Sequence, residues 1–442
     1  MADAKSDRQY VAAIDAGTTS VRCVLFDRNG PVASAQQELE QITIQPGWLE
    51  HDPIELWQKT TAVIEDAMRS ADAKAGDVGA IGLTNQRETT LVTDENHQPS
   101  RAIVWSDTRT SGLCQELIDD GGLDRFRDET GLPVATYFSA SKAAWLVDAM
   151  PGGREKLAAG QLRVGTIDVF LLQCLTHNPA VTDRTNASRT LLMDLERGQW
   201  SNSVCGAFDM PTDALPTIVE SIGGAFGVTM DNTAFGPGVP ITAVLGDQHA
   251  ALFGQCCFAP GDLKATYGTG AFLLMNVGDR RPRSTHGLLE TIAYQHAGQP
   301  PVYALEGSVA NAGSVVQWLR DNLGILERSE DVEPLADSVE DSGGVTFVPA
   351  FSGLFAPHWD ASARGTLLGV TGQTTKAHLA RATLDAVAFQ VTDVVEAMRA
   401  DCGREIKRLA VDGGMCVNDR LMQFQANRHA EQVGLELHEP VV

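Results

Sequence analysis

Two stretches of the chain share one pattern, in which a strand leads into a turn of glycine and threonine and a second strand follows. The first stretch is YVAAIDAGTTSVRCVLFD at residues 10–27, where DAGTTS separates two largely apolar runs. The second is ATYGTGAFLLMN at residues 265–276, with GTG as its turn. One such hairpin lies near the start of each half of the chain. We therefore expect two structurally related domains with a cleft between them.

The first turn has groups that suit a phosphate. Gly17 lets the backbone approach a ligand closely, and the neighbouring residues offer N–H and O–H donors. Asp15, at the end of the first strand, has a carboxylate that can face a magnesium ion. An ordinary β-hairpin with a Gly-Thr turn has the same pattern, so this stretch alone leaves both interpretations open.

Length and charge narrow the class of protein. A chain of 442 residues is too long for one compact core, which favours two large domains or three. The 57 acidic residues outnumber the 34 basic ones, for a net charge of −23. Because such a surface repels phosphate, nucleic acid and anionic membranes are poor partners. A nucleotide site would need local positive charge from Mg²⁺, arginine and backbone N–H groups.

Targeting and thiol signals predict a cytoplasmic protein. The first nine residues, MADAKSDRQ, are polar and lack an apolar leader segment, and no later stretch is long enough for a membrane span. The eight cysteines are scattered and show no C-x-x-C spacing. This argues against a zinc site or a disulfide scaffold and for reduced thiols. Because no stretch is long enough for a membrane span, we also expect no membrane insertion.

Periodicity predicts an α/β fold in which strands come first and then alternate with helices. The segment 53–70 has helical spacing, with Asp52-Pro53 as a cap and first-turn pair. Residues 185–190 are expected to form a polar turn, and residues 223–240 a loop. Further strands are expected at 31–40, 78–84, 91–94, 103–107, 241–245, 345–349 and 409–411, and further helices at 311–326, 377–398 and 419–430.

Two polar motifs follow predicted strands. Arg87 and Glu88 come after the strand at 78–84, where they form either a surface ion pair or a grip on a polyol, with arginine donating to oxygens and glutamate accepting from hydroxyls. Asp412-Gly413-Gly414 follows the strand at 409–411. A glycine pair there lets a ring or a phosphate lie on the backbone, although the same motif occurs in ordinary turns.

Together these motifs resemble the FGGY family of carbohydrate kinases. The segments that carry the resemblance are AIDAGTTS, PGWLEHDP, GLTNQRETT, AIVWSDTRT, TYFSASKAAW, DRTNASRTLL, GDQHAALFGQ, TYGTGAFLLMN, PAFSGLFAPHWD and VDGGMCVND. They occur in family order from residue 11 to about residue 419, so they cover nearly the whole chain. The pair N-Q-R-E-T-T and W-S-D-x-R is typical of the branch of this family that acts on glycerol.

The resemblance implies a fold and a reaction. The fold is α/β with two actin-like (ribonuclease H-like) domains, each a mixed sheet with helices on both faces, and with the active site in the interdomain cleft. We expect the N-terminal domain at residues 1–250 and the C-terminal domain at residues 251–442. The reaction is ATP-dependent, Mg²⁺-assisted phosphorylation of glycerol to sn-glycerol 3-phosphate by direct in-line transfer. A homo-oligomer, either a dimer or a tetramer, is compatible with the family.

The resemblance also implies residue roles. Asp247 would be the general base that accepts the proton of the attacking hydroxyl, and Asp15 would hold Mg²⁺ through water. For the aromatic members of the glycerol pocket, core packing is the alternative interpretation. The implied pocket consists of Arg87, Glu88, Trp105, Tyr137, Asp247, Gln248 and Phe272. The implied ATP contacts are Thr18, Thr19, Ser20 and Arg22 in one domain, and Gly268, Thr269, Gly313, Gln317, Gly413, Gly414 and Asn418 in the other. His249 and His358 are expected to be structural.

Three features depart from the family pattern. Ala16 stands where many members of the glycerol branch have glutamine. The loop at residues 230–238, MDNTAFGPG, lacks the G-G-x-G-T-R element with which some bacterial members bind fructose 1,6-bisphosphate. Family members also continue beyond the equivalent of Val442 with further helices, so we expect a shortened C-terminal domain. Two alternatives stay open: a kinase for another small polyol or sugar, and a nucleotide-binding actin-like module with impaired catalysis.

Overall fold

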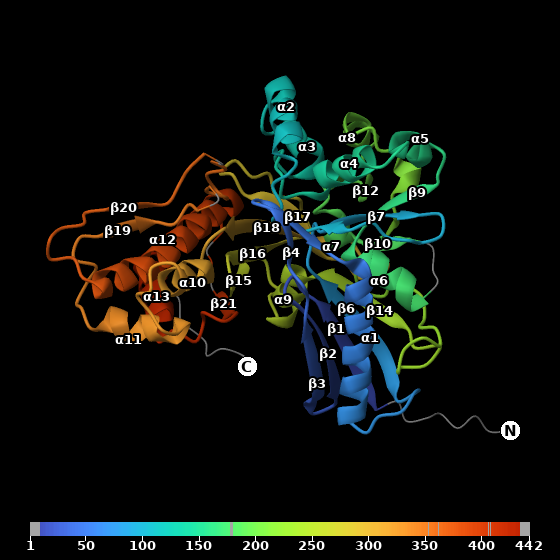
Figure 1. Cartoon of the computed structure of the whole chain (residues 1–442), viewed down its shortest axis with the longest axis horizontal. Helices are drawn as coiled ribbons and strands as arrows, with labels where there is room; N and C mark the ends of the chain where they lie inside the picture. Colours follow the sequence, from blue (N-terminus) through green and yellow to red (C-terminus); the bar gives the residue numbers. More distant parts are fainter. Residues whose placement is uncertain are drawn as a thin grey trace. The chain divides into compact units, whose positions relative to one another are not determined.

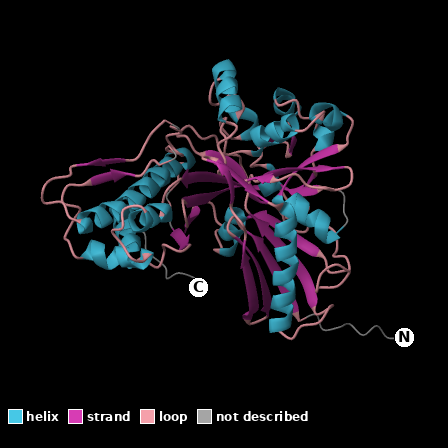
Figure 2. Ribbon diagram, viewed as in Figure 1, coloured by secondary structure: helices cyan, strands magenta, loops and turns pink. Residues whose placement is uncertain are grey.

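The computed structural model describes residues 9–433 except 177–179, 352, 361, 405 and 407. It forms two compact units. Unit 1 is Met1–Ala250 together with Thr291–Pro301, and unit 2 is Ala251–Glu290 together with Val302–Val442. Each unit contains a mixed sheet with helices packed on it (Figures 1 and 2), which confirms the predicted α/β class.

The main sheet of unit 1 has the strand order β14-β6-β1-β2-β3. Strands β1 to β3 form an antiparallel meander, and β6 and β14 run parallel to β1. Their carboxyl ends therefore meet at one edge, where Ala16 pairs with Asn85 and Asn85 pairs with Gly246. Ligands of open α/β sheets bind at such an edge. The bounds are β1 Tyr10–Ala16, β2 Ser20–Asp27, β3 Gly30–Glu38, β6 Val78–Asn85 and β14 Ile241–Gly246.

Helix α1 (Pro53–Ser70) covers this sheet, where it packs against β2 and β3 (Figure 1). It begins where the sequence predicts, because the Asp52 carboxylate accepts a hydrogen bond from the N–H of Ile54 and Pro53 occupies the first turn. Its buried face includes Leu56, Val63, Ile64 and Ala67, which belong to the core of unit 1. Helix α6 (Ile167–Thr176) packs against α1 and β6.

The second sheet of unit 1 has the order β4-β5-β8-β7-β9. The strand predicted at residues 103–107 is wrong in length, because β8 ends at Ile103 and a turn follows. The polar turn predicted at residues 185–190 is only partly present, because residues 185–187 belong to the short helix α7 (Arg184–Ala187) and the turn is confined to residues 188–190. All six predicted residues are buried. The bounds are β4 Ile42–Gln45, β5 Trp48–His51, β7 Thr90–Asp94, β8 Ala102–Ile103 and β9 Leu162–Thr166.

Smaller elements complete unit 1. They are α2 Ser111–Gly121, α3 Arg127–Thr130, α4 Ser139–Ala149, α5 Gly153–Ala158, β10 Val181–Asp183, β11 Met193–Asp194, β12 Gln199–Trp200, α8 Asn202–Ala207, a 3₁₀ turn Thr212–Ala214 and β13 Thr217–Val219. Helix α9 (Asp247–Gly254) follows β14 directly and begins with the predicted base. Because α9 starts at the end of a parallel strand, its first residues lie at the same edge of the sheet as Asn85.

The sheet of unit 2 has the order β17-β18-β16-β15-β21 and repeats the plan of unit 1. Strands β15, β16 and β18 are antiparallel, and β21 runs parallel to β15, as β6 does to β1. Two hairpin-led mixed sheets with the same pairing are what the two Gly-Thr turns predict. The bounds are β15 Asp262–Tyr267, β16 Ala271–Gly278, β17 Leu289–Tyr294, β18 Val302–Val309 and β21 Arg408–Asp412.

The long helix α12 (Lys376–Cys402) packs against β16 and β18, and α13 (Asp419–Val433) packs against α12 (Figure 1). Val387, Val391, Val394 and Met398 of α12 are buried in the core of unit 2. The helix predicted at 311–326 is shorter, since α10 spans Gly313–Asp321. The other elements are a 3₁₀ turn Ser329–Asp331, α11 Val332–Asp337, β19 Thr346–Val348 and β20 Thr366–Leu368.

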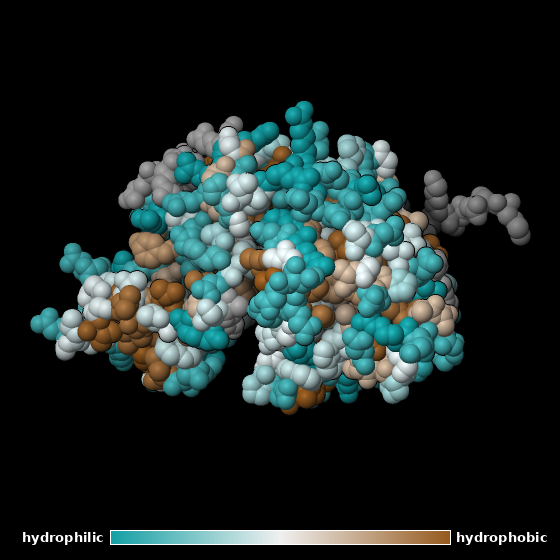
Figure 3. All heavy atoms as spheres, turned by 90° about the horizontal axis from the view of Figure 1, so that it is seen from above, coloured by the Kyte–Doolittle hydropathy of each residue, from teal (hydrophilic) through white to brown (hydrophobic). Residues whose placement is uncertain are grey.

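The surface is hydrophilic over most of the face that Figure 3 draws, and hydrophobic residues occur there in separate groups. Among the described residues, no helix combines the length and the apolar character that crossing a bilayer requires. All eight cysteines are free.

Candidate active site

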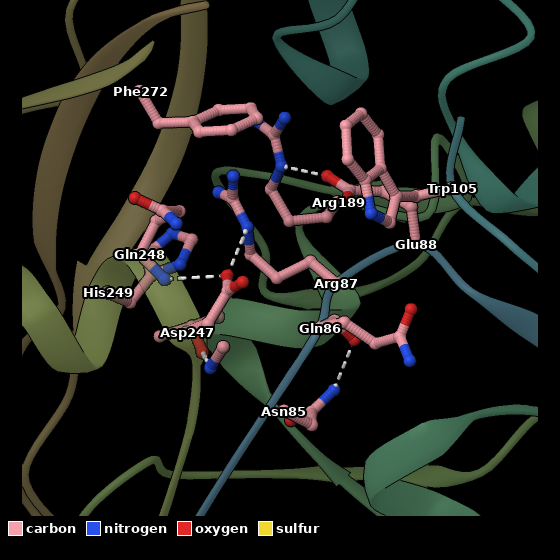
Figure 4. Close-up of polar contacts among 12 residues, drawn as sticks. Asn85, Gln86, Arg87, Glu88, Trp105, Arg189, Asp247, Gln248, His249 and Phe272 are labelled. Carbon is pink, nitrogen blue, oxygen red and sulfur yellow. Dashed lines mark hydrogen bonds and ion pairs between the residues drawn. The ribbon is translucent and has the colours of Figure 1, made fainter. Parts of the chain in front are cut away.

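The edge where β6 and β14 end brings two predicted site residues together. The Arg87 guanidinium Nε lies 3.2 Å from Oδ1 of Asp247, and the N–H of Gln248 donates to the same carboxylate oxygen at 2.7 Å (Figure 4). The Arg87 side chain is 2% exposed, whereas that of Asp247 is 33% exposed. The carboxylate is therefore held from one side and open to a ligand on the other.

Gly246 makes this contact possible. A Cβ at position 246 would lie 2.6 Å from Cγ and Cδ of Arg87. Because no real side chain tolerates that distance, the strand must end in glycine for Arg87 to cross it and reach Asp247. The G-D-Q motif thus has a steric reason, in addition to the chemistry of its aspartate.

Glu88 is fixed by a buried ion pair that the sequence did not predict. The Arg189 Nε donates to Oε1 of Glu88 at 2.7 Å, and the two side chains are 0% and 2% exposed. Glu88 has φ of +59°, and the N–H of Thr89 donates to the carbonyl of Arg87 across it at 2.7 Å. A non-glycine residue in this conformation is strained, and such strain is concentrated at functional sites. The carbonyl of Glu88 accepts a hydrogen bond from the hydroxyl of Ser139.

The aromatic members of the predicted pocket in unit 1 lie next to this pair. The rings of Trp105 and Tyr137 meet edge to face at 5.6 Å, and Arg189 lies 5.6 Å from the Tyr137 centroid and 5.5 Å from that of Phe138. The buried Lys142 ammonium donates to the carbonyl of Tyr137 at 2.9 Å. Burial lowers the pKa of Lys142 to about 8. The backbone that carries Tyr137 is thus fixed from behind.

In the W-S-D-x-R motif, Asp107 and Arg109 support the loop that carries Trp105. Asp107 accepts from the N–H of Leu49 at 2.7 Å and from Nη2 of Arg109 at 2.8 Å. The Arg109 guanidinium packs on two indoles that meet edge to face, 4.2 Å from the ring centroid of Trp48 and 4.8 Å from that of Trp145. Cation–π contacts and a buried ion pair therefore fix the loop that presents Trp105. Tryptophan, aspartate and arginine therefore follow soon after β8, which ends at Ile103.

The Gly-Thr turn of unit 1 has its carbonyls held from behind. The carbonyl of Gly17 accepts from the side chain of Gln86 at 3.1 Å, and that of Thr18 accepts from the side chain of Gln41 at 2.9 Å. In a trans peptide the next N–H points away from the carbonyl. The N–H groups of Thr18 and Thr19 are therefore directed to the opposite side, as in a backbone nest for an anion. The Thr18 hydroxyl accepts from the Trp105 indole at 3.0 Å.

Gln41, His51 and Gln86 form a polar network that the sequence analysis did not assign. The Gln86 amide Nε2 lies 3.1 Å from Nδ1 of His51, and Nε2 of His51 lies 3.4 Å from the Gln41 carbonyl oxygen. Since the amide donates and the carbonyl oxygen accepts, the neutral imidazole with its proton on Nε2 fits both partners. Burial lowers the pKa of His51 to about 4, which keeps the ring neutral. Only the tertiary fold reveals this link behind the turn.

Asp15, Ser20 and Arg22 meet across the same hairpin. Asp15 is paired with Arg22 in the strand register, and Gln36 joins Arg22 to Ser20 through hydrogen bonds of 2.9 Å and 3.1 Å. Burial, and next the charge of Asp247, raise the pKa of Asp15 to about 6, and Arg22 opposes this rise. Two carboxylates that repel each other beside the predicted phosphate turn favour a cation near them.

These residues meet one test of fit to Mg²⁺. The cation takes one or two carboxylates and completes its shell with water and substrate phosphate oxygens. Asp15 and Asp247 supply that number in unit 1. Within the described part of the chain, no group of three or more His, Cys, Asp or Glu side chains is arranged as a self-contained metal site. An ion held jointly with a nucleotide therefore fits this donor set, whereas a resident structural metal does not.

Unit 2 holds its own turn in the same way. The carbonyl of Gly268 accepts from the N–H of Gly313, and that of Thr269 accepts from the N–H of Ala312, both at 2.9 Å. Gly313 must be glycine here, since a Cβ would lie 2.6 Å from the Gly268 oxygen. The N–H groups of Thr269 and Gly270 are thus directed away from α10. Gln317 is exposed on α10, and Phe272 is half-buried on β16.

The predicted adenosine turn in unit 2 is built on Tyr267. Gly413 has φ of +94°, and a Cβ there would lie 2.5 Å from the carbonyl oxygen of Tyr267, which also accepts from the N–H of Met415. Gly414 is exposed, with no atom within 4 Å of its ideal Cβ position. Asn418 caps α13 by accepting from the N–H of Leu421 at 2.7 Å. This arrangement leaves a bare backbone surface at Gly414.

The predicted residues thus fall into two groups. Unit 1 brings together the proposed base, the polar pocket residues and the first phosphate turn, and unit 2 brings together the second turn, Gly313 and the Gly413–Gly414 surface. Residues that the sequence analysis missed are Gln36, Gln41, His51, Gln86, Lys142, Asp183, Thr185, Asn186 and Arg189. Several of them stand in the motifs quoted above, but a motif does not reveal which side chain lies behind another.

Comparison with known proteins identifies a family. Residues 10–254 match the N-terminal domain, and residues 263–437 the C-terminal domain, of the FGGY family of carbohydrate kinases. A protein of Methylorubrum populi named glycerol kinase is 54% identical over 424 residues, which are 94% of this chain and 84% of that protein. A glycerol kinase of Saccharopolyspora erythraea is 50% identical over 98% of this chain and 87% of its own length.

Solved structures are similar in fold. The glycerol kinase of Plasmodium falciparum, determined with ADP, superposes with a TM-score of 0.86 at 37% identity, covering 94% of this chain and 84% of that one. A xylulose kinase of Lactobacillus acidophilus has a TM-score of 0.82 at 22% identity, covering 95% of this chain and 84% of that one. The second similarity concerns the fold alone.

Proposed function

Because the chain belongs to the FGGY family of carbohydrate kinases, we propose that it phosphorylates glycerol, transferring the γ-phosphoryl group of ATP to give sn-glycerol 3-phosphate. The relatives at 50–54% identity are glycerol kinases, which supports this substrate over other polyols. The observation that carries the proposal is two neighbouring ion pairs at the end of β6. Arg87 pairs with Asp247, and Glu88 pairs with Arg189. They present a donor and two acceptors, the groups that a small triol requires.

The chemistry of these groups assigns their roles. Asp247, open to a ligand and fixed by Arg87, accepts the proton of the attacking hydroxyl as its oxygen bonds to phosphorus. Arg87 donates to glycerol oxygens, while Glu88 and Gln248 bind the hydroxyls that do not react. Trp105 and Tyr137 contact the carbon skeleton, and Phe272 of unit 2 is proposed to do the same. A general base of this kind contributes about 10²–10⁴-fold to the rate.

ATP is the phosphoryl donor of a carbohydrate kinase. We assign its phosphates to the N–H and O–H groups of residues 18–20, to Arg22 and to residues 268–269, and its adenosine to the surface around Gly413, Gly414 and Asn418. Asp15 would hold Mg²⁺ through water. When bound, the ion would offset the negative charge that develops on the phosphate oxygens. A cytoplasmic setting and a dimeric or tetrameric assembly belong to the same proposal, and light scattering tests the assembly.

A substrate panel tests the choice of glycerol. ADP release should be fast with glycerol and slow with xylulose or gluconate, because the relatives at 50–54% identity are glycerol kinases. Release with xylulose or gluconate but not glycerol would overturn the substrate. ATP binding by calorimetry without ADP release from any polyol would instead indicate a nucleotide-binding module.

Substituting Asp15 should raise the stability of the fold and lower the activity. In the folded chain the pKa of Asp15 is raised to about 6, so between about pH 4 and 6 the folded state binds more protons than the unfolded state. The ionisation of Asp15 therefore lowers the free energy of unfolding as pH rises through this range. At pH 7, Asp15→Asn should raise that free energy by about 1–2 kcal/mol, allowing for solvent at the carboxylate, while ATP turnover falls.

Urea unfolding at pH 7 and pH 4 without ligand measures this effect. At pH 4 the folded-state carboxyl is already protonated, so the gain should largely vanish. Asp66→Asn, on the exposed side of α1, is the matched control and should leave turnover unchanged. A destabilised Asp15→Asn protein at pH 7, or an equal gain at both pH values, would contradict the raised pKa.

A further inference from the structure

The segment at residues 183–189, DRTNASR, is buried and lies behind the groups that do the chemistry. Asp183, Thr185 and Asn186 are at most 1% exposed, and Ser188 and Arg189 are also buried. A polar segment in such a place must have its hydrogen bonds satisfied by defined partners. Those partners include residues of β14 and β6 and, through one intermediate residue, α9.

The first contact reaches the end of β14. The N–H of Gly246, the residue before Asp247, donates to the Thr185 hydroxyl at 2.9 Å. The Thr185 hydroxyl in turn donates to Oδ1 of Asp183 at 3.0 Å, since a carboxylate can only accept. The carboxylate therefore orients the hydroxyl so that its lone pairs face Gly246.

The second contact reaches the end of β6. Asn186 and Asn85 exchange reciprocal amide hydrogen bonds of 3.0 and 3.1 Å, and Asn85 precedes Arg87 by two residues. Nδ2 of Asn186 also donates to Oδ1 of Asp183 at 2.9 Å. One carboxylate thus holds both connections. Burial raises the pKa of Asp183, and the hydrogen bonds from Asn186 and Thr185 counteract this rise.

The remaining contacts continue along the segment. The hydroxyls of Ser188 and Thr291 lie 2.8 Å apart, and Nε2 of His249, two residues after Asp247, lies 3.2 Å from the Thr291 hydroxyl. Arg189 completes the set through its ion pair with Glu88 (Figure 4). The segment therefore has a direct or one-step link to the chain near Asp247, Arg87 and Glu88.

We propose that Thr185, oriented by Asp183, is a positioning residue for the reaction: it fixes the end of β14 so that Asp247 stays in line with Arg87 and the attacking hydroxyl. This inference rests on the proposed function. Thr185 is fully buried and holds the N–H of Gly246, so its effect is on the placement of the base. A base displaced by about 1 Å costs on the order of 100-fold in rate.

Thr185→Val and Thr185→Ser form the matched test. Valine keeps the shape but removes the hydroxyl, and we expect kcat to fall about 10–100-fold while KM for glycerol changes far less. Serine keeps the hydroxyl and should restore kcat close to the wild-type value. Circular dichroism and the melting temperature show whether each variant is folded. Ser188→Ala is a milder variant, expected to lower kcat about 2–10-fold through one lost hydrogen bond.

The outcomes separate this proposal from the function on which it depends. A wild-type chain without glycerol-dependent ADP release contradicts the function. An active wild type with an unchanged Thr185→Val kcat, or with equal losses in the valine and serine variants, contradicts the positioning role. A kcat loss that only follows the folded fraction indicates a structural role and also overturns it. If Thr185→Val does not fold, Thr185→Ala removes the same hydroxyl, and a folded Thr185→Ala protein with wild-type kcat contradicts the proposal.

Discussion

Asp247→Asn should lower kcat for glycerol phosphorylation by about 10²–10⁴-fold and leave the fold intact. The amide keeps the size of the carboxylate but cannot accept the hydroxyl proton. Its ion pair with Arg87 is open to solvent on the Asp247 side, so the loss of stability should be small. Steady-state ADP release measures the rate, and calorimetry measures glycerol affinity, which should be largely kept.

Asp66→Asn again provides the control, because it removes one carboxylate from an exposed helix face without altering the site. Its turnover should equal that of the wild type. A turnover of Asp247→Asn within a few-fold of the wild type would remove Asp247 from its role. Loss of glycerol binding together with rate would make it a binding group instead.

Arg189→Met should destabilise the protein by about 3–5 kcal/mol, because it leaves the carboxylate of Glu88 buried without its partner. Glu88 is 2% exposed and already holds a strained backbone conformation. With its partner gone, the carboxylate either takes up a proton or moves toward solvent. Either change weakens the acceptor for a glycerol hydroxyl, so KM for glycerol should rise. Denaturant unfolding and initial rates measure the two effects.

The double variant Arg189→Met/Glu88→Gln identifies the cause. Because it removes the unpaired charge, it should recover part of the lost stability while glycerol affinity stays poor. Arg189→Lys keeps the charge but loses the planar guanidinium that packs on Tyr137 and Phe138, so an intermediate stability is expected. A double variant that is less stable than Arg189→Met would show that packing, not the buried charge, accounts for the loss.

Local sequence signals predicted the parts of the fold that depend on local physics. The Asp52 cap and first-turn proline place the start of α1, and glycine-threonine turns place both hairpins. Strands β17 and β18 were not predicted, and the strand proposed at 103–107 was too long. At that point a buried arginine that packs on two indoles imposes a turn that periodicity alone cannot show.

The site residues also divide into those that sequence motifs indicate and those that only the tertiary fold reveals. Arg87 and Glu88 were noted in their own segment as either a surface ion pair or a polyol-binding pair, and the family resemblance assigned the role of Asp247. Thr185 was placed in a polar turn, although it is buried in the short helix α7. Its role depends on the N–H of Gly246, 61 residues away, and no local pattern encodes such a contact. Arg189 was missed for the same reason, since Glu88 is 101 residues away.

The central claim is that this chain couples ATP cleavage to glycerol. The most direct test incubates the full chain with ATP, Mg²⁺ and glycerol, and quantifies ADP and sn-glycerol 3-phosphate in the same sample, with parallel samples that lack glycerol. We predict equal amounts of the two products and little ADP without glycerol. ADP formed at the same rate without glycerol, or with free phosphate in place of sn-glycerol 3-phosphate, would contradict the account.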